Sequence, residues 1–379
     1  MAQQHHETTT GTGTAGEALT AYLQDQATEF LRSLRLHRES STDAQGAEEA
    51  LAAACSLRRA ARRIGGTLHT FRPLLDEDWS ASLRPELAWL SGTLAQEHAY
   101  ESRLARLLDA LHRLSGPPPV PATVPAPAAA TVTAIGKRPA RRSGRPLLDR
   151  SRGRGPGEAW VTAEVPVTNG ESGPPRGLAV GAAKAAALLE RQLTLARTRA
   201  HSAALQALGS SRFHAVADNV AVLASEVPFN GATDGLERLA GTAESALAEA
   251  VAALPLGQAG HPYNAGALVH GLAADTAPDA QDAPWLKVRS LLRLHRYAQE
   301  VLLGHAPPEP RIADASHALN VHREASAAAA AAAQAARTPR IAPATAYALG
   351  VLHADQRHDV EAARFAFQQA WLHEETRTW

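Results

Sequence analysis

The chain has 379 residues, of which 45% are hydrophobic and only 4% aromatic, and its 38 Lys and Arg residues balance 38 Asp and Glu residues. This length suffices for two or three domains with sizeable cores. The balanced charge excludes a uniformly basic protein, so a site for a polyanion must come from the local distribution of charge. An alanine-rich, aromatic-poor composition favours closely packed helices over a β-sandwich.

Features of secreted or membrane proteins are missing from the sequence. Cys55 is the one cysteine, so an intramolecular disulfide is impossible and a thiolate zinc site is not expected. The polar first residues lack the apolar core of a secretory signal, and no run of about 18 uncharged apolar residues occurs. We therefore expect a soluble cytoplasmic protein with no membrane partner.

Helical periodicity runs along most of the chain and strand signals are scarce, so we predict an all-α fold. Residues 1–15 are expected to form a disordered tail. Residues 115–177 contain twelve prolines and nine glycines and are expected to be a disordered insert. The first helical half spans residues 16–114, with breaks around 40–46 and 72–82. The remaining helices fall within residues 178–372, at about 178–208, 212–227, 235–254, 285–303, 325–336 and 344–371.

One predicted helix carries a stripe of arginines. Residues 56–75 read SLRRAARRIGGTLHTFRPLL, with five arginines and no acidic residue. On a helical wheel the apolar residues cluster within about 80° on one face, and Arg58 and Arg62 lie on the opposite face with Gly65 and Gly66. Each glycine costs a helix up to about 1 kcal/mol relative to alanine. We expect the pair to let either a ligand or another helix approach the backbone closely.

A second predicted helix repeats this stripe 231 residues later. The shift places Arg58 on Arg289 and Arg62 on Arg293, and Arg296 extends the second stripe. Like charges one helical turn apart repel by a few tenths of a kcal/mol. A sequence that served helix stability alone would intersperse glutamates. Two such stripes therefore predict an anionic ligand, and their repetition predicts two related helical halves.

These segments resemble the CHAD domain family, named for its histidines and α-helices. The first stripe is similar to the family's pattern of a histidine followed by spaced arginines, and residues 296–300 (RYAQE) match its second signature, Arg-Tyr-Ala-x-Glu. The segments SSRFHAVADNVAVLA and LNVHREA also look like the family. The resemblance covers about residues 16–114 and 178–372. Cys55 and Leu286 depart from it, because they stand where the family has its two histidines.

The resemblance implies two tandem four-helix bundles related by a pseudo-two-fold axis, and binding of inorganic polyphosphate in a shared basic cleft. Arginines on successive helical turns lie about 5.4–6 Å apart and can meet alternate phosphates of such a chain. Gly65 and Gly66 are expected to keep the path of the ligand open, and polyphosphate granules are the expected location. The expected binding residues are Arg58, Arg62, Arg63, His69, Arg191, Arg199, Arg212, Lys287, Arg289, Arg293, Arg296 and His322.

Two other functions compete with this hypothesis. The arginine helices and the basic insert would also suit the phosphates of a nucleic acid. In a structural adaptor, the stripes would instead pair with acidic helices of the same chain, such as residues 237–249. The sequence has no GxSxG motif, no Walker A loop and no pair of histidines spaced as in HExxH. We therefore expect no enzymatic activity, no cofactor and no metal site.

Overall fold

The structure of the protein, a computed structural model, describes residues 15–40, 46–115, 176–231, 235–261, 278–304 and 309–372, with residues 266, 269, 306 and 307 between them. The disorder expected for residues 1–15 and 115–177 lies outside these ranges, except that Ala15, Ser115, Arg176 and Gly177 lie on helices. The described residues are almost entirely helical, and their only β pairing is an isolated bridge between Leu75 and Phe229. The predicted all-α class is confirmed.

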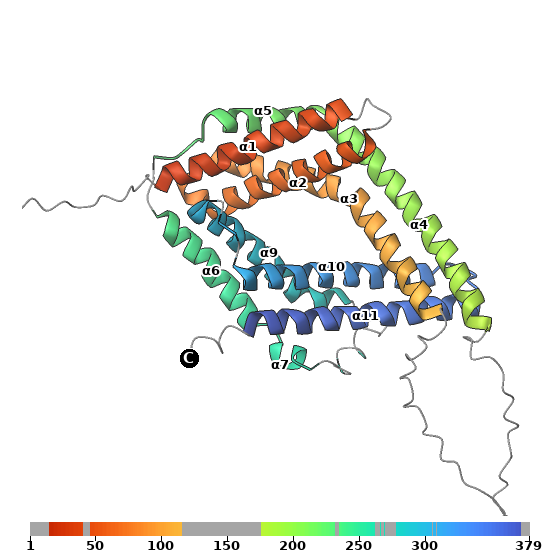
Figure 1. Cartoon of the computed structure of the whole chain (residues 1–379). Coiled ribbons are helices and arrows are strands. Elements are labelled where there is room, and N and C mark those ends of the chain that lie inside the picture. The colour runs from red at the N-terminus through yellow and green to blue at the C-terminus, as the bar shows by residue number, and fades with distance from the viewer. Residues whose placement is uncertain are drawn as a thin grey trace, which may run out of the picture. The chain divides into compact units, whose positions relative to one another are not determined.

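Ten α-helices and one 3-10 helix (η1) occupy the described residues, and Figure 1 labels them. None of these helices is long and apolar enough to cross a bilayer. Their bounds are α1 (Ala15–Ser40), α2 (Ala47–Thr70), η1 (Arg72–Leu74), α3 (Glu77–Ser115), α4 (Arg176–Leu208), α5 (Ser211–Ser225), α6 (Leu236–Ala252), α7 (Leu256–Ala259), α9 (Pro278–Leu303), α10 (Pro310–Ala336) and α11 (Pro343–Leu372).

The two predicted breaks in the first half have visible causes. At Gly46 a Cβ atom would lie 2.3 Å from the carbonyl oxygen of Ser40, so only glycine allows the chain to pass from α1 to α2 there. The second break, between α2 and α3, is shorter than the predicted 72–82. The side chain of Asp76 accepts a hydrogen bond of 2.8 Å from the backbone N–H of Trp79, which caps the first turn of α3.

The first bundle consists of α1, α2, the N-terminal part of α3, and α5 around one hydrophobic core. The apolar face predicted for α2 is fully buried in it. Each leucine, isoleucine or phenylalanine side chain of this face contributes about 1.5–3 kcal/mol when it is removed from water. The residues of that face are Leu57, Ala61, Ile64, Leu68, Phe71 and Leu75, each 0% exposed.

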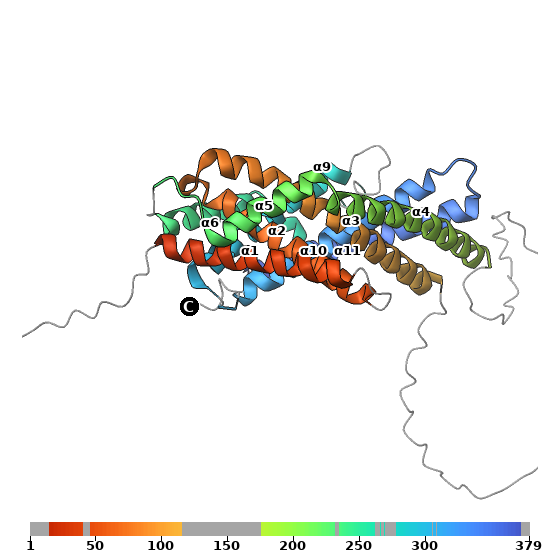
Figure 2. The ribbon, with the colours of Figure 1, turned by 90° about the horizontal axis from the view of Figure 1, so that it is seen from above.

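The second bundle consists of α6, α9, α10 and the C-terminal part of α11, around a core that includes Trp285 and Phe367. The rings of these two residues meet edge to face, with centroids 5.8 Å apart. A third core lies where α3 and α4 pack against the alanine-rich part of α10 and against α11. Figures 1 and 2 both show α3 and α4 running side by side from the first bundle to this core.

The two bundles meet where α2 packs against α9. A Cβ atom at Gly66 would lie 2.6 Å from Cδ2 of Tyr297, so a glycine is required for this approach. Gly66 and Tyr297 are equivalent positions under the shift of 231 residues, so the contact joins matching points of the two halves. Of the two roles expected for the glycine pair, Gly66 serves the contact between helices. Gly65 faces Leu87 at an ordinary distance of 3.6 Å.

Candidate functional site

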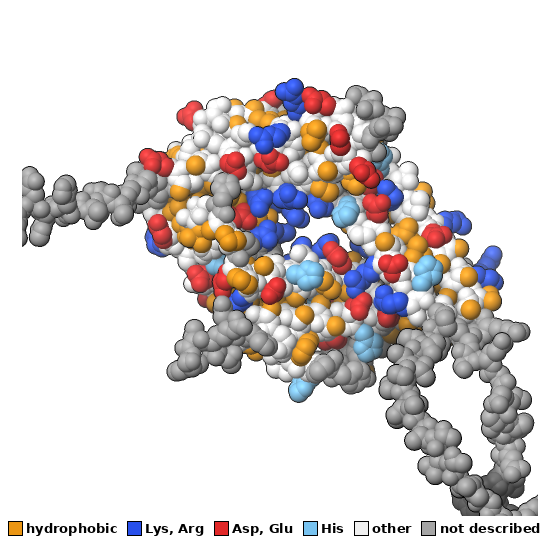
Figure 3. Space-filling view, in the orientation of Figure 1, with side chains coloured by type: hydrophobic (Ala, Val, Ile, Leu, Met, Phe, Trp, Pro, Cys, Tyr) orange, Lys and Arg blue, Asp and Glu red, His pale blue; other side chains and the backbone are white. Residues whose placement is uncertain are grey.

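Arginine side chains from four helices converge between the two bundles. We call this group the arginine cluster, and Figure 3 shows Lys and Arg side chains gathered around a hollow between α2 and α10. Because α2 and α9 cross with matching residues in contact, the two predicted stripes face each other there. The members of the cluster are Arg58 and Arg62 on α2, Arg103 on α3, Arg289 and Arg293 on α9, and Arg323 on α10.

The arginine cluster has few partners within the part of the chain that the structure describes. The Nε–H groups of Arg58, Arg62, Arg103 and Arg323 are shielded from solvent and meet no hydrogen-bond acceptor there. Arg289 donates from Nε to Oδ1 of Asn320 at 2.9 Å, which satisfies one donor without neutralising the charge. Arg323 pairs with the exposed carboxylate of Glu324 at 3.2 Å. Six guanidinium groups therefore share one carboxylate among the described residues.

Burial and the closeness of the positive charges lower the pKa values of arginines in the cluster. Burial is the main cause that lowers the pKa of Arg289 to about 10, and the positive charges of Arg323, Arg293 and Arg62 lower it further. Burial also lowers the pKa of Arg293, and the charges of Arg62, Arg296 and Arg323 act in the same direction. These guanidinium groups still carry their charge at neutral pH. A site of this kind is stabilised by any anion that enters it.

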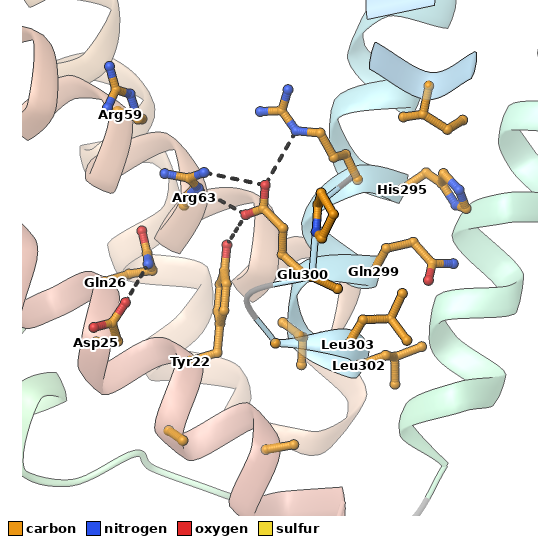
Figure 4. Close-up of a pocket in the computed structure, with 18 of the residues that line it drawn as sticks. Tyr22, Asp25, Gln26, Arg59, Arg63, His295, Gln299, Glu300, Leu302 and Leu303 are labelled. Atoms are coloured by element: carbon orange, nitrogen blue, oxygen red, sulfur yellow. Dashed lines mark hydrogen bonds and ion pairs between the residues drawn. The ribbon is translucent and has the colours of Figure 1, made fainter. Parts of the chain in front are cut away.

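Arg63 and Arg296 contact a different part of the molecule. The carboxylate of Glu300 accepts hydrogen bonds from Nε of Arg63 at 2.9 Å and from the hydroxyl of Tyr22 at 2.7 Å, and it lies 3.4 Å from Nε of Arg296. All four residues line a cavity of about 910 Å³ bordered by α1, α2, α6 and α9 (Figure 4). Glu300 therefore neutralises charge that the sequence pattern had assigned to ligand binding.

Other expected binding residues lie outside the cluster and have partners of their own. Arg212 forms an ion pair with Glu86 at 2.5 Å, and its guanidinium carbon stacks 4.0 Å from the ring centroid of Trp89. His69 is exposed and lies 2.8 Å from a guanidinium nitrogen of Arg84. Three further residues are exposed, and the structure shows no contact between them and the cluster within the described ranges: Arg191 and Arg199 on α4 and Lys287 on α9.

His322 belongs to the core of the second bundle. Its side chain is 1% exposed and its ring stacks on Trp285, with centroids 5.9 Å apart. The Nε2 atom accepts a hydrogen bond of 3.3 Å from Nε of Arg364. Arg364 and Arg357 in turn bind the buried carboxylate of Asp282 at 2.6 and 2.8 Å. This network leaves His322 no access to a ligand in the hollow, although the sequence placed it near the arginine stripes.

Two members of the cluster, Arg103 and Arg323, were not among the residues expected from the sequence. Arg323 lies in the LNVHREA segment that resembled the family, and a choice of Arg323 over its neighbour His322 would have found it. Arg103 occurs in a helix of mixed charge, and no pattern distinguishes it from the arginines around it. In the described residues no group of three or more His, Cys, Asp or Glu side chains is placed to hold a metal ion.

The family model for the CHAD domain matches residues 25–319, from the first helix into α10. The chain belongs to the CHAD domain family. The solved structure of PptA from Streptomyces chartreusis is similar, with 55% sequence identity, coverage of 95% of this chain and 99% of that chain, and a TM-score of 0.70. A comparison with curated protein sequences gave no match.

Cys55 and Leu286 stand where the resemblance to the family placed two histidines. Cys55, at the first of these positions, is half-buried. Leu286, in the second, is 39% exposed. The arginines one turn further along each helix, Arg58 and Arg289, both remain in the cluster. The paired stripes therefore keep their place although Cys55 and Leu286 are not histidines.

Proposed function

We propose that the protein binds inorganic polyphosphate in the hollow lined by the arginine cluster, without catalysing a reaction on it. The observation that carries the proposal is that four buried Nε–H groups of the cluster have no acceptor among the described residues. A buried donor that lacks an acceptor costs about 1–3 kcal/mol. Phosphate oxygens would satisfy these donors and would neutralise the crowded charges at the same time.

A flexible chain with repeated negative charges fits the arrangement better than a single small anion. The cluster draws on four helices, and Arg62 lies close enough to Arg289 and Arg293 for its charge to lower their pKa values. Successive phosphates of one chain can each contact a different guanidinium group. The resemblance to the family points to the same ligand, and association with polyphosphate granules in the cell is part of this proposal.

Within the arginine cluster the described residues give the adaptor alternative little support, although Glu300 pairs with Arg296 at the end of the second stripe. This alternative requires the arginine stripes to pair with acidic side chains such as those of α6. No ion pair joins Glu237, Glu244 or Glu249 to the cluster within the described part of the chain. The arginines therefore remain available to an external ligand.

Binding of single-stranded nucleic acid is also less well supported than binding of polyphosphate. Stacking of bases needs exposed aromatic rings beside the basic groups. Tyr297, Phe71 and Phe213 are at most 2% exposed, so they offer no such ring. Tyr100, whose ring centroid lies 5.3 Å from the guanidinium carbon of Arg103, is a half-buried aromatic residue beside the cluster, so the hollow offers little surface for stacking. The basic insert lies outside the described residues. The titration with DNA described below tests whether the full-length protein, insert included, binds nucleic acid.

The test is a titration of the full-length protein with long-chain polyphosphate, duplex DNA and single-stranded DNA at several salt concentrations. We expect the tightest binding for polyphosphate, with affinity that falls as salt rises. The variant Arg62→Gln/Arg293→Gln removes two charge-assisted contacts of about 1.5–3 kcal/mol each. Its dissociation constant for polyphosphate should therefore rise by about 100-fold or more.

The matched control is Arg32→Gln/Arg35→Gln, which removes two exposed charges from α1, each paired with a glutamate of the same helix. It should change the dissociation constant by less than about threefold, because these charges are screened. An unchanged affinity in the cluster variant would overturn the proposed site. Equal affinity for all three polyanions would show a general polyanion surface instead of a polyphosphate site.

A further inference from the structure

A small cavity continues the arginine cluster between α3 and α10. It has a volume of about 70 Å³ and is lined by Ala99, Ser102, Arg103, Arg106, Arg323, Glu324 and Ala327. A cavity needs about 10–15 Å³ of volume open to a water-sized probe to hold one water, so this one has room for several waters or one tetrahedral anion. We call it the α3–α10 notch. The side chains of Ala99 and Ala327 are small, which is why two helices can leave a space of this size.

The free donors of the notch come from two guanidinium groups. The Nε–H groups of Arg103 and Arg323 are shielded from solvent and lack an acceptor in the described part of the chain. Arg106 is held by Gln356 at 2.5 Å and by Asp359 at 2.6 Å, so it forms a fixed wall. The one carboxylate that lines the notch is Glu324, which pairs with Arg323 at 3.2 Å.

Arg323 connects the notch to the rest of the cluster. Its positive charge lowers the pKa of Arg103 on one side and those of Arg58, Arg289 and Arg293 on the other, in each case in addition to burial. An anionic chain that follows the arginines of α2 and α9 therefore reaches Arg323 and then the notch. The notch is too small for a chain to pass through it with several groups at once.

The end of a polyphosphate chain differs chemically from its interior. An internal phosphate has one ionisable oxygen and two bridging neighbours, whereas a terminal phosphoryl group has one neighbour and a second ionisation. That second ionisation gives a phosphate monoester a charge of about −1.5 to −2 at pH 7. We infer that the α3–α10 notch binds the terminal phosphoryl group of a polyphosphate chain, through Arg103 and Arg323. This inference rests on the proposed function of the arginine cluster.

The experiment compares polyphosphate chains of one length with free ends and with both ends capped as phosphoramidates. Capping leaves the internal phosphates unchanged and removes the doubly ionised ends. The wild-type protein should bind free-ended chains about tenfold more tightly than capped chains. The variant Arg103→Gln should lose this preference, because free-ended chains lose more affinity than capped chains do. Arg103→Lys, which keeps the charge but loses the planar donor fork, should recover part of the preference.

Arg113→Gln is the matched control, because Arg113 lies on the same helix in an exposed ion pair with Asp355, and it should keep the preference. Circular dichroism and thermal melting are used to check that each variant is folded. Equal binding of free and capped chains by the wild type overturns the inference and leaves the proposed function intact. The inference is also overturned, with the proposed function intact, if Arg103→Gln keeps the preference for free-ended chains. The same holds if the variant weakens the binding of free-ended and capped chains equally. If the wild type binds neither ligand, the proposed function fails as well.

Discussion

Arg62 and Arg63 are neighbours in sequence and lie in different electrostatic environments. Successive residues of a helix point about 100° apart, so Arg62 faces the arginines of α9 while Arg63 reaches the carboxylate of Glu300 at 2.9 Å. The charge of Arg63 is neutralised within the fold. The charge of Arg62 has no carboxylate partner among the described residues, so it adds to the positive electrostatic potential of the hollow.

His322 makes the stability of the protein depend on pH. Burial is the main cause that lowers its pKa to about 4, although the charge of Asp282 raises it. In the unfolded chain the pKa is about 6.5, so between pH 6.5 and 4 the unfolded state binds more protons than the folded state. The free energy of unfolding should therefore fall by about 3 kcal/mol as the pH falls through this window. Denaturant unfolding at intervals from pH 7 to pH 4 measures the loss.

Two histidine variants separate this effect from general acid sensitivity. His322→Gln should have a much smaller pH slope in the same window. His317→Gln, at an exposed position of the same helix, should keep the slope of the wild type. A slope in His322→Gln as steep as that of the wild type would contradict the prediction.

At the scale of the elements, the contact of α2 with α9 depends on one of two adjacent glycines. In Gly66→Ala the new Cβ atom would lie 2.6 Å from Tyr297, which is 2% exposed and has little room to move. We expect a loss of stability of about 1–3 kcal/mol, as for other overpacked contacts. In Gly65→Ala the nearest atom is 3.6 Å away, so the better helix propensity of alanine should raise stability by up to about 1 kcal/mol.

Thermal unfolding of the two variants measures both effects against the wild type. The melting temperature should fall in Gly66→Ala and stay level or rise in Gly65→Ala. A fall of equal size in both would mean that the helix tolerates no alanine at either position for a reason other than the contact with Tyr297.

The elements themselves could largely be predicted from the sequence. The apolar face of α2 has a period of 3.6 residues that depends only on local spacing, and burial of Leu57, Ile64 and Leu68 confirms it. The repeat of 231 residues likewise predicted that two matching helices exist. It did not predict that they contact each other at Gly66, because nothing in a single helix shows which other helix will pack against it.

The members of the candidate site were harder to predict, for a physical reason. Whether an arginine is free depends on carboxylates far away in sequence, as the pairing of Arg63 with Glu300 shows. The same holds for Arg212, whose partner Glu86 lies on another helix. Arg103 joins the cluster only because α3 runs beside α10. Spacing along one helix contains no information on such contacts.

At the scale of the whole molecule, Glu300 ties the two bundles together. Its carboxylate on α9 accepts hydrogen bonds from Tyr22 on α1 and Arg63 on α2. In Glu300→Gln the guanidinium groups of Arg63 and Arg296 lose their counter-charge. We expect a loss of about 1–3 kcal/mol in the free energy of unfolding, because partly buried donors are left unsatisfied. Denaturant titration at neutral pH measures it.

The comparison for this prediction is Glu86→Gln, which breaks the more exposed pair with Arg212. Exposed ion pairs contribute about 0–1 kcal/mol, so this variant should lose less stability than Glu300→Gln. If the two variants are equally stable, Glu300 is one more surface partner and does not link the bundles.

The contact of Gly66 with Tyr297 also bears on how such a molecule can arise. In a symmetric homodimer, a position on the two-fold axis meets a copy of itself. Two glycines would leave a gap there, and two tyrosines would clash at this distance. A chain that carries both halves can place glycine on one side of the axis and tyrosine on the other, which a symmetric homodimer cannot. Fusion of the halves into one polypeptide therefore permits a filled and closer helix crossing than self-association of either half could reach.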